Sequence, residues 1–285
     1  MSIHIFARAY CVASHCLLAA ALLAPTAAVA QTDYFNTDRG RPLQTQDALA
    51  IERYALELQA APLRWSRAAG PHVVWAVEPE LAYGILPRTQ LEIGLPFYFT
   101  DGFDAGSRGG IGAVHLSVMH VLNVETLGFP AMALEAGVAI PAGRFGASDL
   151  YTTLGAIATR TMAVGRVHVN AEFTQGNGIA ATDRRWEESR SAGLEELSRW
   201  KAGVAVDRAL PLRSMLLGAE LVASRSMRDG ADVDWNTAAG VRWQLAPQWA
   251  VDGGIGRSFG DSREWSLTVG AAWSFGLIHL IPLNR

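Results

Sequence analysis

Charged and polar side chains recur at every second position of several otherwise apolar segments in this sequence. Side chains of an extended strand alternate between its two faces, so this spacing collects the charges on one face and leaves the other apolar. Carboxylates slightly outnumber basic groups among these charged side chains. This weakly favours cations or neutral solutes over anions as the molecules that the interior would bind or conduct. The twelve candidate residues for a polar interior are Glu57, Glu78, Glu80, Glu92, Arg166, His168, Glu172, Lys201, Asp207, Glu220, Arg242 and Asp252.

Two interpretations of these charges stay open. They pair with one another across a narrow interior and fill it, or some of them line a conduit or a pocket for small solutes. The number of strands does not decide between the two. Eight strands leave room for side chains alone and sixteen or more leave a water channel, whereas this sequence supports about twelve.

Residues that could catalyse a reaction do not assemble into a recognisable site. No histidine begins an HExxH zinc motif, and the glycine runs at 109–112 and 253–256 do not continue into the phosphate-binding GxGxxG pattern. Ser117 with His115, or Ser224, would be the candidates for a lipid-acting barrel enzyme, but composition alone supports them. We therefore expect no enzymatic activity, no cofactor and no metal ion.

Aromatic residues mark the ends of two alternating segments. Trp265, Trp273 and Phe275 share the apolar face of the final segment, while small and polar residues occupy its other face. Trp235 and Trp243 are eight residues apart, which at about 3.3 Å per residue and a tilt of about 40° separates them by roughly 20 Å along a barrel axis. Aromatic girdles bound the apolar band of an outer-membrane barrel, and we assign these five residues to such girdles.

The alternating segments predict an all-β fold, a single transmembrane antiparallel up-and-down barrel of about twelve strands. Short turns at 86–88, 162–164, 210–212 and 246–248 alternate with longer polar links, which is the pattern of outer-membrane barrels. The competing fold is a soluble β-sandwich or barrel, whose strands would also alternate. The expected strands are 53–65, 72–84, 89–98, 110–122, 131–140, 150–160, 165–175, 199–207, 213–224, 233–245, 249–258 and 264–275.

The first 30 residues have the features of a secretory signal peptide. Arg8 precedes an apolar run at 17–23, and a small-x-small site places cleavage after Ala30. Both cysteines, Cys11 and Cys16, lie inside this segment, so the mature chain would contain no cysteine. We expect export to the outer membrane of a Gram-negative bacterium.

The rest of the chain is expected to form one domain. Residues 31–50 are polar and are expected to form a periplasmic N-terminal segment, and residues 51–285 are expected to form the barrel. No apolar run after residue 30 is long enough for a membrane helix. The net charge of −3 and pI of about 6.2 do not suggest a nucleic-acid partner. Membrane lipid and small solutes are the expected partners.

Several short motifs resemble a known family of barrels. The stretch from Tyr83 to Glu92 is similar to a strand–turn–strand motif of that family, and Leu95-Pro96, Gly109–Gly112 and Ile140–Gly143 follow it in the expected order. Over about residues 72–275 the chain resembles the outer-membrane "MetA-pathway of phenol degradation" family. Ala113 stands where that family often has an acidic residue. The resemblance implies passive transport of small organic, including hydrophobic aromatic, compounds. A plugged barrel with a binding or structural role is the alternative, and the loop 176–198 would distinguish a receptor from a pore.

Overall fold

The computed structural model describes most of the chain after the predicted signal peptide. The described residues are 35–60, 63–67, 73–101, 108–143, 145–146, 149–177, 197–227, 229–260 and 263–276. The predicted signal peptide and most of the loop 176–198 lie outside them. No helix among the described residues is long and apolar enough to cross a bilayer.

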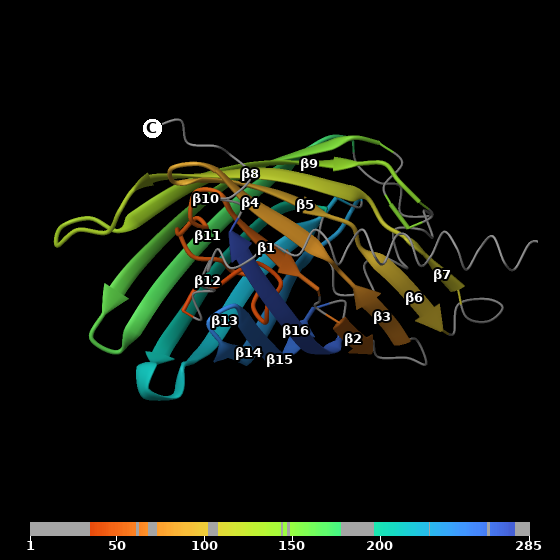
Figure 1. The fold of residues 1–285 in the computed structure, drawn as a ribbon. Helices are drawn as coiled ribbons and strands as arrows, with labels where there is room; N and C mark the ends of the chain where they lie inside the picture. Colours follow the sequence, from red (N-terminus) through yellow and green to blue (C-terminus); the bar gives the residue numbers. More distant parts are fainter. Residues whose placement is uncertain are drawn as a thin grey trace, which may run out of the picture.

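Sixteen strand segments form one closed antiparallel sheet (Figure 1). The sheet closes where β16 pairs with both β1 and β2. The segments are β1 (Ala55–Gln59), β2 (Leu63–Arg67), β3 (Val73–Val77), β4 (Glu80–Leu86), β5 (Thr89–Gly94), β6 (Phe97–Asp101), β7 (Arg108–Ile111), β8 (Val114–Asn123), β9 (Ala131–Ile140), β10 (Tyr151–Met162), β11 (Gly165–Gln175), β12 (Ser198–Leu210), β13 (Met215–Ser226), β14 (Val233–Ala246), β15 (Trp249–Phe259) and β16 (Trp265–Gly276).

The first four barrel strands are each interrupted once, so the sixteen segments make twelve strands. The interruptions at Glu78-Pro79, Leu95-Pro96 and Gly112-Ala113 lie side by side across the sheet. Proline cannot donate to the ladder, which accounts for two of them. The Leu95 N–H donates to the Pro79 carbonyl at 3.1 Å and the Gly112 N–H to the Pro96 carbonyl at 2.9 Å, so neighbouring strands stay linked. The predicted twelve-stranded antiparallel barrel is confirmed.

The outer face of the wall is apolar and the inner face is polar. On β16, Leu267 and Val269 are about half exposed outside, whereas Thr268 and Ser274 are buried inside. Trp235, Trp243 and Trp265 are also about half exposed on the outer face. Trp273 stacks on Trp249 with ring centroids 5.7 Å apart and contacts Phe275 at 4.7 Å. All five predicted girdle residues therefore lie on the outer face, and Trp249 extends the set.

The two ends of the barrel differ in their connections. At one end, here the turn end, short turns join β4 to β5, β10 to β11, β12 to β13 and β14 to β15, and a longer turn at 124–130 joins β8 to β9. The longer links lie at the other end, here the loop end. There Phe145 packs inward on Tyr98, with ring centroids 5.8 Å apart, and both belong to a buried apolar cluster with Val74 and Ala76.

Candidate functional site

Residues 35–53, here called the plug, run through the barrel lumen before β1 begins (Figure 1). An irregular segment leaves backbone groups unpaired, and buried backbone groups need partners. Inward-facing wall side chains supply them. The Gln44 and Thr45 N–H groups each donate to Glu220 at 2.8 Å, and the Thr45 hydroxyl donates to the same carboxylate. The wall acceptors for other plug N–H groups are Asn170, Thr159 and Gln90, which pair with Gln46, Ala48 and Ile51.

This placement corrects the interpretation of 31–50 as a periplasmic segment, because its described part lies inside the barrel. The polarity of the segment alone does not distinguish a periplasmic position from a position in a polar lumen. The polar residues are needed here because the lumen wall they face is itself polar and charged.

A buried charge cluster joins the plug to the wall near β14–β16. Arg41 of the plug and Arg242 of β14 are 0% and 1% exposed. Arg41 lies 2.5 Å from Asp38, 3.0 Å from Glu57 and 3.8 Å from Asp252. Arg242 pairs with Asp38 and lies 3.7 Å from Glu57. Burial alone would raise the pKa of Asp38, but Arg242 and Arg41 outweigh it and hold that pKa below its usual value. Removing one member would strand a buried charge, which is strongly destabilising.

A second cluster joins the plug to β11 and β12. Arg166 donates to Asp207 at 3.0 and 2.5 Å and to Asp47 of the plug at 3.1 Å. Asp207 also accepts from the Thr37 hydroxyl at 2.9 Å and contacts His168 Nε2 at 2.9 Å. Burial raises the pKa of Asp47 to about 6, because the opposing attraction of Arg166 and His168 is weaker. Asp47 has only one short contact to the guanidinium, whereas Asp207 has two.

A third set of ion pairs holds the middle of the plug. Arg39 Nη2 lies 2.7 Å from both Glu135 on β9 and Glu172 on β11. Lys201 on β12 also pairs with Glu172, at 3.2 Å. The Gln46 amide donates to Glu135 at 2.5 Å. Burial lowers the pKa of Arg39, but the attraction of Glu135 and Glu172 raises it by more. The net pKa is above its usual value, so Arg39 is always charged.

Close packing complements these polar contacts. A Cβ atom at Gly254 would lie 2.7 Å from Pro42 Cβ, and one at Gly218 would lie 2.8 Å from Leu43 Cδ1. Real Cβ atoms do not approach so closely, so the wall is glycine where the plug passes. Ala48 is fully buried in an apolar group with Met119, Val121, Ala131, Ala133 and Ile157.

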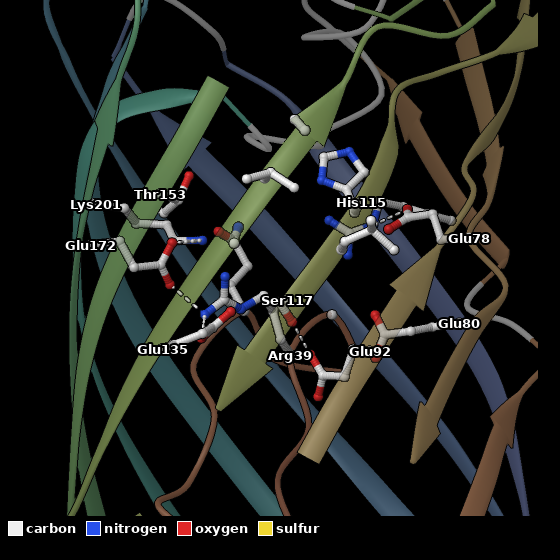
Figure 2. A pocket seen from close by; sticks show the side chains of 17 residues that line it. Arg39, Glu78, Glu80, Glu92, His115, Ser117, Glu135, Thr153, Glu172 and Lys201 are labelled. Carbon is white, nitrogen blue, oxygen red and sulfur yellow. Dashed lines mark hydrogen bonds and ion pairs between the residues drawn. The ribbon is translucent and has the colours of Figure 1, made fainter. Parts of the chain in front are cut away.

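A cavity of about 180 Å³ remains between the plug and the wall (Figure 2). Arg39, Gly40 and Gln44 of the plug form one side. Ser117 donates to Glu92 at 2.7 Å within it, and Arg64 lies 3.7 Å from Glu78. The other lining residues are Glu80, His115, Leu116, Glu135, Gly137, Val138, Ala139, Thr153, Glu172 and Lys201. The lining combines charged groups with small apolar surfaces.

The structure places all twelve predicted interior residues on the inner side of the wall. Seven of them contact the plug through their side chains: Glu57, Arg166, Glu172, Asp207, Glu220, Arg242 and Asp252. His168 contacts the plug-binding Asp207, while Glu78, Glu80, Glu92 and Lys201 line the cavity. The charges therefore pair mainly with the plug, a partner that the alternation of the strands does not reveal.

The serine candidates for catalysis face the lumen. Ser117 bonds to Glu92, and Ser224 is only 2% exposed. A further serine, missed from the sequence, lies in a GxSxG pattern at Gly256–Gly260. That pattern activates a serine at a sharp strand-to-helix turn. Here it runs along β15, and Ser258 accepts the Glu264 N–H at 3.0 Å.

Comparisons with known proteins support the fold. The chain matches no family model and has no significant match among curated protein sequences. Among solved structures, it is similar to a COG4313 outer membrane channel from Pseudomonas putida F1, with a TM-score of 0.53 and 14% identity over 84% of this chain and 100% of that one. It is also similar to the translocator domain of the autotransporter NalP from Neisseria meningitidis, with a TM-score of 0.50 and 10% identity over 78% and 89%.

These likenesses show the fold of outer-membrane β-barrels. The barrel that the "MetA-pathway of phenol degradation" resemblance implied is thus confirmed, whereas membership of that particular family stays a prediction.

Proposed function

We propose that the protein is an outer-membrane channel for small compounds whose lumen is closed by the plug until the plug moves. The observation that carries the proposal is the attachment of the plug by side chains of the wall. Such contacts to a terminal segment can be exchanged without breaking the barrel ladder, because no plug residue belongs to a barrel strand.

The proposed cargo is a small organic compound. A cavity of about 150 Å³ suffices for benzene in an engineered protein, so the volume of about 180 Å³ suits one substituted ring. The small residues Gly137 and Ala139 beside Glu92 and His115 suit a ring with a polar substituent. This agrees with the aromatic compounds that the family resemblance implies.

The filled lumen also favours the second candidate, a permanently closed barrel with a binding or structural role. The two candidates differ in whether the plug must leave the lumen. A reversible covalent tether between plug and wall separates them.

Thr45 and Gly203 offer positions for this tether. The Thr45 Cγ2 atom lies 3.2 Å from where a Cβ of residue 203 would be, and a disulfide places each sulfur about 3 Å from the opposite Cβ. The double variant Thr45→Cys/Gly203→Cys, made in the mature chain, would be refolded and studied in planar bilayers and by liposome swelling. Heat-modifiable gel migration reports folding, and each single variant is a control.

We expect conductance and uptake of a phenol-sized solute in the reduced state and their loss on oxidation. Equal passage in both states would refute a moving plug. No passage in either state, with a folded barrel, would favour the closed-barrel candidate.

A further inference from the structure

The long turn at 124–130 is fixed by an arginine on the outer face of the barrel. Along β10 the even-numbered side chains point outward, as the exposure of Leu154 and Met162 shows, while Ile157 and Thr159 are buried inside. Arg160 therefore faces outward near the turn end. A charged group on this face needs compensation, because the lipid side of a barrel disfavours arginine.

The turn supplies that compensation. Arg160 donates to the carbonyls of Thr126 at 2.5 Å, Leu127 at 2.6 Å and Phe129 at 3.0 Å. Glu125 lies 3.5 Å from Arg160 and accepts from the Thr161 N–H and hydroxyl at 2.8 and 2.7 Å. The bond from the Thr161 hydroxyl lowers the pKa of Glu125, which keeps it ionised beside the arginine. The turn is thus a defined structure that leans outward over β10.

The hydrogen bonds to Arg160 use only backbone carbonyls of the turn, so the apolar side chains of the turn remain exposed. Leu127 is 100% and Phe129 63% exposed. Two neighbouring turns continue this surface, because β9 pairs with β10, β10 with β11 and β11 with β12. They carry Val164, which is 68% exposed, and Leu212, which is 103% exposed.

Two arginines lie within the same surface. Arg208 is exposed on the outer face of β12, in line with the outward Val204 and Val206, and Arg213 is exposed in the next turn. Leu127, Phe129, Val164, Leu212, Arg208 and Arg213 are here called the rim patch. Apolar side chains interspersed with basic ones are the composition of surfaces that lie in a membrane interface.

We infer that the rim patch binds the headgroups of anionic phospholipids in the leaflet at the turn end. Continuity with the apolar outer wall favours lipid over a soluble protein partner, since Val204 and Val206 lead directly to Arg208. An arginine at such a position extends its apolar stem along the wall and its guanidinium toward phosphates. The inference requires the membrane location in the proposed function, but not transport, because a closed barrel would bind lipid equally.

The first experiment measures lipid retention by native mass spectrometry. The mature protein would be equilibrated in micelles with phosphatidylglycerol or phosphatidylcholine of the same acyl chains. We expect preferential retention of phosphatidylglycerol, reduced about fivefold for each arginine removed in Arg208→Gln/Arg213→Gln. The matched control Arg225→Gln/Arg257→Gln removes two exposed charges at the loop end and should leave the preference unchanged. Equal retention of both lipids, or equal loss in the control, would overturn the inference.

The second experiment locates the apolar part of the patch. Because the predicted mature chain has no cysteine, Leu127→Cys and Leu212→Cys can each carry one environment-sensitive fluorophore in vesicles containing phosphatidylglycerol. We expect blue-shifted emission that is quenched by headgroup-labelled lipid. Quenching by aqueous iodide instead would place the patch in water, as a protein-docking surface would require, and would contradict the inference. Neither readout depends on conductance.

Discussion

The Arg39 guanidinium of the plug lies 2.7 Å from the carboxylate of Glu135 on β9, and this ion pair joins the plug to the lumen wall. The same Nη2 atom also reaches Glu172 at 2.7 Å. We predict that Arg39→Gln weakens plug attachment by about 1 to 2 kcal/mol, since partly exposed ion pairs contribute up to about 1 kcal/mol each. That corresponds to roughly a 5- to 30-fold larger population of detached plug. Single-channel recording should show more frequent opening.

Lys201→Gln is the matched control for Arg39→Gln. It removes one positive charge from the same cavity and from the same Glu172, but Lys201 belongs to the wall. We expect a change in ion selectivity without the increase in opening. An equal increase in both variants would show that the cavity charge, and not attachment of the plug, controls opening.

Glu220 is expected to hold the plug through backbone bonds. In wild type the Gln44 and Thr45 N–H groups donate to different oxygens of the Glu220 carboxylate. Glu220→Gln replaces one of these oxygens with an NH2 group, which is a donor and cannot accept a hydrogen bond from either N–H group. An unpaired buried donor costs about 1 to 3 kcal/mol, so hydrogen exchange of residues 40–50 should accelerate at least fivefold. Glu92→Gln, a lumen carboxylate that bonds to Ser117 and Gln90 of the wall, should leave this exchange unchanged. Unchanged exchange in Glu220→Gln would contradict the prediction.

Two adjacent glycines of β15 test the packing of the plug. Gly254→Ala places a Cβ 2.7 Å from Pro42, whereas Gly253→Ala meets only the Thr268 carbonyl oxygen at 3.6 Å. Overpacking costs about 1 to 3 kcal/mol, so we expect Gly254→Ala to increase protease cleavage within 35–50 and Gly253→Ala to match wild type. Similar cleavage of the two variants would mean that the plug does not pass against Gly254.

The wall was predictable from sequence because a barrel imposes one simple period on it. Outward positions such as Trp235 and Trp243 must be apolar, and the positions between them face a polar lumen, so the alternation located the twelve strands to within a few residues. The interruptions were less evident because proline at 79 and 96 breaks the ladder without ending the strand. Glu135 was missed because the segment around it is otherwise almost wholly apolar.

The plug could not be identified in the same way. Its conformation is irregular and depends on partners such as Glu220 and Asn170, which are more than 100 residues distant in the chain. One signal was present: buried charges need partners, and neither interpretation of the twelve inward charges named a specific partner for any of them. The charged residues Asp38, Arg39 and Arg41, in the segment before the first strand, supply such partners.

Asp47 predicts that closure depends on pH. Its pKa is about 6 in the docked plug and returns toward 3.8 when the plug is detached. The docked state therefore binds the proton more tightly, so acidification favours docking as pH falls from about 6 to 4, by up to tenfold per pH unit. The lowered pKa of Asp38 opposes this only below its ordinary value of 3.8. Conductance should thus fall between pH 7 and pH 5. Besides Asp47, the charged and titratable groups at this site are Arg166, His168 and Asp207. Asp47→Asn should remove the dependence, and a dependence that persists in this variant would assign it to another group.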